Sequence, residues 1–252
     1  MQISRINAMK KSFVDLHLCP PINQPDKVKA LVEKSSELGY SIVGLTFPVD
    51  ISKDSIKNMQ GICRDSGLDL VTRIDLTPKN AKELLNILSK VRWKFEVVAV
   101  QCTTKEVAVQ AAKDRRVDLL FLNLIDLKKH FFSASEAKLA FEKSAALEVN
   151  MAPLILLDGY PRIRLMSILR RDVLIAKKIG IPIVLSSGAS NPQMLRRPED
   201  YAYLAYLIGL EMHIAKQAIS DNPKSIVERN RRKLGGNYVQ PGVYVIRRGK
   251  DC

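Results

Sequence analysis

Short, almost continuously apolar segments recur along this chain, and each is followed by a segment with helical spacing. The apolar segments are rich in Val, Ile and Leu at successive positions, which is typical of parallel strands covered on both faces. The alternation predicts an α/β protein built from repeated strand-helix units. The expected strands cover residues 13–18, 41–47, 68–76, 95–102, 117–124, 152–158 and 181–187.

About seven such units in 252 residues favour a TIM-barrel-like (β/α) barrel that is incomplete. A doubly wound open sheet is the alternative. If it bound a dinucleotide it would normally carry a glycine-rich turn after the first strand, and residues 17–25, HLCPPINQP, form no such turn. Two helices, expected at 199–219 and 223–233, follow the seventh strand. An eighth strand is therefore missing, minimal or hidden near residues 207–212.

No linker or low-complexity stretch divides the chain. We expect one barrel domain over residues 1–234 and a basic C-terminal tail over 235–252. The N-terminus carries no secretory signal, and the longest apolar runs are too short to span a bilayer. These features predict a soluble, cytoplasmic protein.

Four cysteines are widely scattered, at Cys19, Cys63, Cys102 and Cys252. No C-x-x-C pair exists, so neither a zinc ribbon nor a dithiol redox motif is available. Disulfides stay open on the sequence alone. Buried thiols that pack as small hydrophobes are the favoured interpretation for a reducing compartment.

Polar residues follow several of the predicted strands, at the end where a (β/α) barrel carries its functional face. In the first strand Asp15, His17 and Cys19 alternate, so an extended backbone would direct all three side chains to one face. Arg73 and Asp75 share one face of the third strand, and both charges must be neutralised if they are buried. Ser186 and Ser187 end the seventh strand.

This set is a poor match to a hydrolytic metal centre. Two or three ions need roughly half a dozen His and carboxylate ligands. The chain has three histidines, and His130 and His213 lie away from the strand ends. The turn Ser186–Ala189 lacks the G-x-S-x-G pattern of a serine nucleophile. We therefore expect no catalytic residue, no bound metal and a buried hydrogen-bonded network around Asp15 and His17.

The charge balance is strongly basic, with 40 Lys and Arg against 26 Asp and Glu, a net charge of +14 and a pI near 9.7. This balance favours a nucleic-acid partner over a membrane, since no amphipathic anchor is evident. A generally basic proteome or adaptation to high temperature is the alternative. No sequence-reading RNA module is present, so contacts to the RNA backbone are expected. The candidate RNA-binding residues are Arg162, Arg164, Arg170, Arg171, Arg196, Arg197, Arg231, Arg232, Lys233, Arg247 and Arg248.

Three blocks of sequence resemble the thirty-kilodalton protein subunit family of ribonuclease P, whose archaeal members are called protein component 3. They are FVDLH (13–17), RIDL (73–76), and SSGAS (186–190) followed by LRRPED (195–200). The resemblance runs from about Phe13 to Arg232. It implies an incomplete barrel related to the polymerase and histidinol phosphatase metalloenzymes. Those relatives begin Asp-x-His-x-His, and Cys19 stands here in the place of the last ligand.

The resemblance also implies a division of labour. Catalysis would belong to the ribonuclease P RNA, which removes the 5′ leader of precursor tRNA with magnesium held on the RNA. The chain would bind that RNA beside protein component 2 and other protein subunits. Helix faces near Tyr203 and Tyr206 are candidate docking surfaces, and core packing of the same faces is the alternative. Two alternatives stay open. One is a free-standing metal-dependent phosphoesterase that uses Asp15, His17 and Asp75, and the other is a small-molecule enzyme that binds phosphate at Ser186–Ala189.

Overall fold

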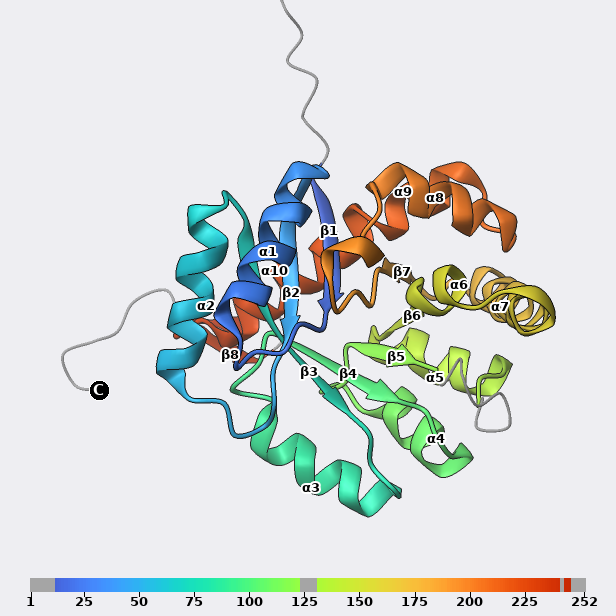
Figure 1. Cartoon of the computed structure of the whole chain (residues 1–252). Helices are drawn as coiled ribbons and strands as arrows, with labels where there is room; N and C mark the ends of the chain where they lie inside the picture. Colours follow the sequence, from blue (N-terminus) through green and yellow to red (C-terminus); the bar gives the residue numbers. More distant parts are fainter. Residues whose placement is uncertain (1–11, 123–130, 241–242, 246–252) are drawn as a thin grey trace, which may run out of the picture.

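Seven parallel strands form the centre of the molecule (Figure 1). The computed structural model describes residues 12–122, 131–240 and 243–245. Each strand pairs with the next one along the chain, so the sheet order is the sequence order. The strands are β1 (Phe13–Leu18), β2 (Tyr40–Thr46), β3 (Asp69–Leu76), β4 (Val97–Gln101), β5 (Leu119–Phe121), β6 (Ala146–Asn150) and β7 (Ile183–Ser186).

The first and last strands meet at their C-terminal ends. Leu18 forms an isolated parallel bridge with Ala189, and the Cys19 N–H donates to the Ala189 carbonyl over 2.8 Å. This bridge brings the two edges together, and the sequential strand order excludes the doubly wound alternative, in which the order reverses. The prediction of an incomplete TIM-barrel-like fold is confirmed.

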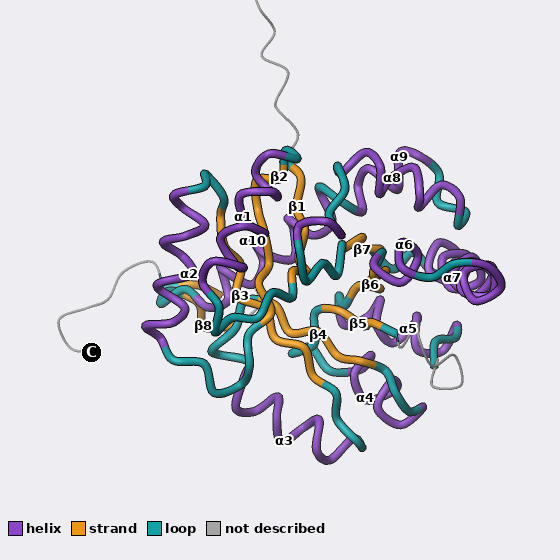
Figure 2. Tube along the Cα trace, viewed as in Figure 1, coloured by secondary structure: helices purple, strands orange, loops and turns teal. Residues whose placement is uncertain are grey.

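Helices surround the strands (Figure 2). Several begin at side-chain caps: Ser52, Asn80 and Thr104 each accept a hydrogen bond from a backbone N–H three residues later. The helices are α1 (Pro25–Glu37), α2 (Lys53–Asp65), α3 (Ala81–Val91), α4 (Lys105–Lys113), α5 (Ala134–Lys143), α6 (Ala152–Leu156), α7 (Gly159–Ile179), α8 (Pro198–Leu207), α9 (Met212–Ala218) and α10 (Asp221–Leu234).

The sixth strand lies earlier in the chain than predicted. Residues 152–158 begin with the short helix α6, and β6 is the preceding segment 146–150, ALEVN. The Asn150 side chain accepts a hydrogen bond from the Ala152 N–H over 2.9 Å and turns the chain directly after the strand. Pro153 then stands in the first helical turn, where its missing N–H costs nothing. Glu148 interrupts the apolar pattern of β6, which is why the pattern favoured the wrong segment.

The segment after β7 is helical, as predicted, but it is divided. Gly209 has a positive φ of 95° and separates α8 from α9, so the expected helix 199–219 is two helices. Residues 207–212 form the end of α8 and a turn, and hold no strand. Pairing of the described residues therefore gives a seven-stranded barrel sheet.

Helix α10 closes the end of the barrel at which the strands begin. Its Ile226 and Val227 pack into the apolar cluster that fills the barrel interior, together with residues such as Val14 and Val97. Two of its asparagines satisfy backbone groups at strand starts. Asn222 Nδ2 donates to the Ile183 carbonyl and Asn230 Nδ2 to the Glu96 carbonyl, each over 2.8 Å.

A bulge in β1 decides where its polar residues point. Between Asp15 and Leu18, three steps of β1 stand opposite two steps of β2, from Val43 to Leu45. The backbone of β2 approaches β1 so closely here that a Cβ on Gly44 would lie 2.4 Å from the Leu16 carbonyl oxygen. Glycine is therefore required at this crossing.

The C-terminal tail begins where α10 ends, at Leu234. It forms a short antiparallel hairpin of β8 (Tyr238–Gln240) and β9 (Val243–Tyr244). The predicted RNA-binding residues Arg247 and Arg248 lie outside the described residues, as do His130 and Cys252. The division of the chain into domain and tail stays a prediction.

The cysteines within the described residues are free thiols. Cys63 and Cys102 are buried, and burial raises the pKa of each to about 12. Both therefore stay protonated and pack as small hydrophobes. In the part of the chain that the structure describes, we find no helix that is both long and apolar enough to cross a membrane.

Candidate site at the strand ends

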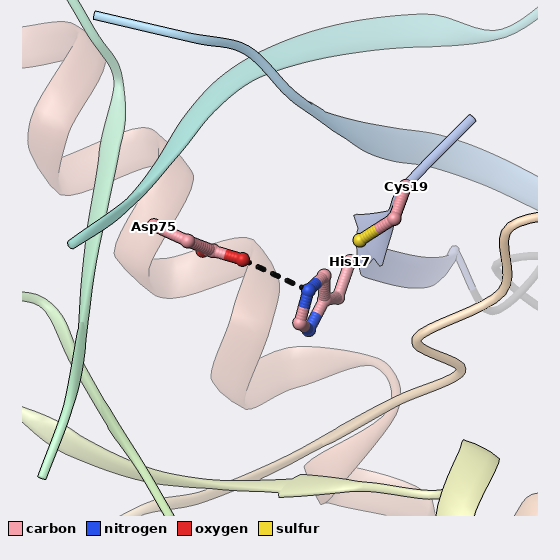
Figure 3. Close-up of side chains that lie close together, drawn as sticks. All are labelled: His17, Cys19 and Asp75. Carbon is pink, nitrogen blue, oxygen red and sulfur yellow. Dashed lines mark ion pairs between the residues drawn. The ribbon is translucent and has the colours of Figure 1, made fainter. Parts of the chain in front are cut away.

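Four charged side chains meet inside the barrel near the ends of three strands. His17 comes from β1, Arg73 and Asp75 from β3, and Glu148 from β6. The side chains of Arg73 and Glu148 are fully buried, and His17 is nearly so. Figure 3 shows the His17 ring directed at Asp75, with Cys19 beside it.

Arg73 stands at the centre of this cluster. Its Nη1 and Nη2 donate to the two oxygens of Glu148, each over 2.6 Å, and its Nε donates to Asp75 Oδ1 over 2.6 Å. Nη1 also donates to the Leu16 carbonyl at the bulge over 3.1 Å. The planar guanidinium therefore satisfies two carboxylates and one backbone group at once, which a lysine ammonium could not do with the same geometry.

His17 joins the same two carboxylates from the other side. Its Nε2 lies 3.0 Å from Asp75 Oδ2 (Figure 3), and its Nδ1 lies 3.2 Å from Glu148 Oε1 without the alignment of a hydrogen bond. The Phe121 ring packs against both cations. It meets the His17 imidazole edge-on, with 6.1 Å between the ring centroids, and its centroid lies 5.9 Å from Arg73 Cζ. Two cations and two carboxylates thus form a closed set, which we call the strand-end network.

The protonation of the network follows from its charges. Burial alone would raise the pKa of Asp75 and of Glu148. The positive charges of Arg73 and His17 lower these pKa values by more than burial raises them, so both carboxyls have pKa values below their usual range. Burial and Arg73 would lower the pKa of His17, yet Glu148 and Asp75 raise it well above its usual value. With His17 protonated, the buried charges sum to zero, which limits the cost of removing them from water.

The Asp15 side chain does not share a face with that of His17, contrary to expectation, although the two buried residues are hydrogen-bonded as predicted: Asp15 Oδ1 accepts from the His17 backbone N–H over 3.1 Å. Its neighbours Val14 and Leu16 both belong to the barrel interior, so Asp15 between them faces outward, and the bulge then returns His17 to the interior. Asp15 Oδ1 accepts from the Ser187 N–H over 3.1 Å. Asp15 therefore ties β1 to the turn after β7, and burial raises the pKa of its carboxyl.

Ser186 and Ser187 support that closure and do not join the strand-end network. Ser187 Oγ donates to the His17 carbonyl over 3.3 Å and accepts from the Ala189 N–H over 3.1 Å. Ser186 is buried, and its hydroxyl has no hydrogen-bond partner among the described residues. Gly188 has a positive φ of 63°, and a Cβ there would collide with the Asn150 side chain at 2.2 Å. This turn is therefore tightly packed.

The cluster fits a metal ion poorly. His17, Cys19 and Asp75 each bring one ligand atom within 4.8 Å of the others. The ring nitrogens of His17, however, already lie against carboxylates, with Nε2 3.0 Å from Asp75 and Nδ1 3.2 Å from Glu148. Arg73 already donates to Asp75 and places a full positive charge where an ion would need negative ligands. The contacts seen here are those of a closed ion-pair network, and the absence of a bound metal stays a prediction.

Sequence reasoning found three of the four members and missed Glu148. The available signal was a lone acidic residue within a short segment that is otherwise apolar, ALEVN. An unpaired carboxylate in a buried strand demands a cationic partner, and Arg73 was already expected to need an anionic one. Because the sixth strand was predicted at 152–158, Glu148 lay outside every predicted strand and was not paired with Arg73.

The predicted RNA-binding residues lie on several surfaces, and many already hold structural contacts. Arg231 is the most engaged, with two bonds to Asp69 and one to Glu96. Arg164 and Arg197 are exposed, and no contact of their side chains with an acceptor is seen among the described residues. Five others donate locally: Arg162 to the Leu157 carbonyl, Arg170 to Leu207, Arg171 to Asp172, Arg196 to Gln193 and Leu195, and Arg232 to Glu228. Lys233, in the last turn of α10, is half-buried. RNA binding by this set stays a prediction.

Comparison with known proteins decides the family. The family model described as RNase P subunit p30 matches residues 12–234. The chain belongs to this family. The ribonuclease P protein component 3 of Methanosarcina mazei is 31% identical over 230 residues, which cover 90% of this chain and 93% of the relative. The mouse ribonuclease P protein subunit p30 is 26% identical over 79% of each chain.

Solved structures agree on the fold of this p30-family chain. A chain of archaeal ribonuclease P, determined with mature tRNA, matches with a TM-score of 0.81 at 23% identity, covering 94% of this chain and 99% of that one. A putative prolidase from Bifidobacterium longum matches with a TM-score of 0.60 at 11% identity, covering 87% of this chain and 70% of that one.

Removal of one charged residue from the strand-end network should leave the others buried without a partner and destabilise the fold. We expect Arg73→Met to lower the free energy of unfolding by about 3–5 kcal/mol, because it leaves Glu148 and Asp75 without their guanidinium. Arg73→Met with Glu148→Leu should recover most of that loss, since His17 and Asp75 still form a neutral pair. Urea denaturation of both variants measures the difference.

The exposed pair Lys29–Glu33, 3.8 Å apart on α1, supplies the control. Lys29→Met should cost less than about 0.5 kcal/mol, as for other solvated helix pairs. A double variant no more stable than Arg73→Met would contradict charge neutrality as the organising feature of the network.

The stability of the protein should fall as the pH rises above the ordinary histidine range. The pKa of His17 is raised on folding, so its contribution is complete below about 6.5, the unfolded value, and is lost as the pH climbs through the folded value. His17→Gln should remove this dependence. Urea midpoints of the two proteins at several pH values test the sign, and parallel curves for both would show that His17 is not the group responsible.

Proposed function

We propose that this chain is a non-catalytic protein subunit of ribonuclease P that binds and supports the catalytic RNA. The observation that carries this proposal is the strand-end network. At the end of the barrel where (β/α) barrels perform chemistry, the charged side chains of His17, Arg73, Asp75 and Glu148 are engaged in ion pairs with one another. Membership of the RNase P subunit p30 family, over residues 12–234, supports the same function.

Electrostatics supply the mechanism. Folded RNA brings phosphates close together, and a net charge of +14 on a rigid barrel lowers the repulsion between them. The catalytic RNA would then reach its active fold at a lower magnesium concentration. Each phosphate that the protein binds should add about 0.7–0.9 to the slope of log affinity against log salt. Magnesium would be held by the RNA, with no cofactor on the protein.

The expected partners are the ribonuclease P RNA, precursor tRNA, protein component 2 and the other protein subunits, and we place the assembly in the cytoplasm. A groove on α8 suits contact with another protein. Tyr203, Tyr206 and Leu207 are exposed there, and they line the groove with Arg196 and Leu204.

Reconstituted cleavage of precursor tRNA tests this function. With the RNA and the other subunits present, addition of this chain should lower the magnesium concentration needed for half-maximal cleavage. Arg196→Ala combined with Arg197→Ala should raise that concentration and leave the melting temperature nearly unchanged, because Arg196 contacts only nearby carbonyls and Arg197 is exposed.

Lys53→Ala with Lys57→Ala on α2 is the matched control, since both side chains are exposed and the same charge is removed. This control should leave the magnesium concentration needed for half-maximal cleavage unchanged. An identical curve with and without the chain would reject the proposed function.

A further inference from the structure

A second charged cluster lies at the opposite end of the barrel, where the strands begin. Asp118, directly before β5, is fully buried and accepts from two arginines. Arg92 Nη1 donates to its Oδ2 over 3.0 Å, and Arg229 Nη2 donates to its Oδ1 over 2.8 Å. Oδ2 also accepts from the Val98 N–H over 3.0 Å. One carboxylate thus holds together α3, β4, β5 and α10.

Two further cations belong to the same end of the barrel. Lys233 stands one turn beyond Arg229, in the last turn of α10, and Arg115 is an exposed residue of the loop that leads to Asp118. Two arginines at bonding distance share a single carboxylate, so the cluster carries an excess of positive charge. This is the opposite of the strand-end network, whose charges cancel.

The excess of positive charge around Asp118 leaves one nitrogen of Arg92 without a partner in the part of the chain that the structure describes. The side chain of Arg92 is only 8% exposed, and its Nη2 is buried without any acceptor among the described residues. A buried guanidinium N–H without an acceptor is costly. By contrast, Arg231 on the same helix as Arg229 pairs with both Asp69 and Glu96. The cluster around Asp118 is therefore short of negative charge, and an anion would supply it.

The single tryptophan of the chain stands beside this cluster. Trp93 follows Arg92 in the turn between α3 and β4, and 70% of its surface is exposed. Lys94, the next residue, is also exposed. A large exposed aromatic side chain can stack on an unpaired base, and cations nearby can hold the phosphates of the same strand.

We propose that this end of the barrel binds a single-stranded segment of RNA. We call it the basic end and define it by Arg92, Trp93, Arg115, Arg229 and Lys233. A phosphate would lie against Arg115 and Lys233 above the buried Arg92, and an adjacent base would stack on Trp93. The inference rests on the proposed function, because it names the part of the chain that contacts the RNA. An aromatic platform favours RNA over a small oxyanion, which needs only the cations.

Fluorescence of Trp93 reports on this surface directly, since no other tryptophan contributes. Titration of the full chain with a short single-stranded oligouridylate should quench the emission in a saturable manner. Inorganic phosphate at the same phosphate concentration should leave it nearly unchanged. Equal effects of the two would reveal a small oxyanion site and overturn the RNA assignment.

Variants then separate charge from stacking. Arg115→Gln with Lys233→Gln should weaken binding of labelled RNA about tenfold or more, and the salt slope should fall by about 0.7 for each phosphate that the variant no longer binds. Trp93→Ala should weaken binding at least about fivefold, with most of the affinity recovered by Trp93→Phe. The control Lys79→Gln with Lys105→Gln removes the same charge from exposed positions at the other end and should retain the wild-type slope.

The same variants, assayed on ribonuclease P RNA, distinguish the two proposals. If the chain binds that RNA and lowers the magnesium requirement, yet neither the basic-end variants nor Trp93→Ala alter binding, the basic end is wrong and the function stands. If the unaltered chain fails to bind the RNA, the proposed function itself is wrong. Melting temperatures within a few degrees of the wild type verify that each variant is folded.

Discussion

The buried guanidinium of Arg73 is the interaction on which the rest of this barrel depends. It bonds to both oxygens of Glu148, to Asp75 and to the Leu16 carbonyl, and so links β3 to β6 and β1 across the barrel interior. Its charge, with that of His17, matches two carboxylates that would otherwise be unpaired in a medium of low dielectric.

The rest of the fold fits around this centre. The bulge in β1 brings His17 to the interior and requires Gly44 on β2, while Asp15 holds the turn after β7. At the other end α10 plugs the interior and satisfies the starts of β4 and β7. Such a rigid frame is suited to hold surface cations at fixed positions, which is what recognition of a folded polyanion needs. The strand-end network is neutral and the basic end is not.

Much of the fold could be predicted from the sequence because parallel strands leave an unmistakable apolar pattern. Six of the seven strands lie where that pattern placed them. The sixth was misplaced because Glu148 breaks the apolar pattern. A buried glutamate in a strand can be predicted only once its partner Arg73 is known to lie across the barrel. The common face of Asp15 and His17 was wrong because a one-residue bulge leaves no mark in composition. The cluster around Asp118 joins four elements distant in sequence, and no local pattern reveals such a convergence.

We propose that the strand-end network, closed by its own ion pairs, holds no catalytic metal. The most direct measurement is the metal content of the purified full-length protein after equilibration with zinc or manganese and removal of loosely bound ions, paired with a phosphodiester hydrolysis assay free of RNA. We expect far less than one ion per chain and no turnover. One tightly held ion per chain, with RNA-free hydrolysis that Asp75→Asn abolishes, would contradict this proposal.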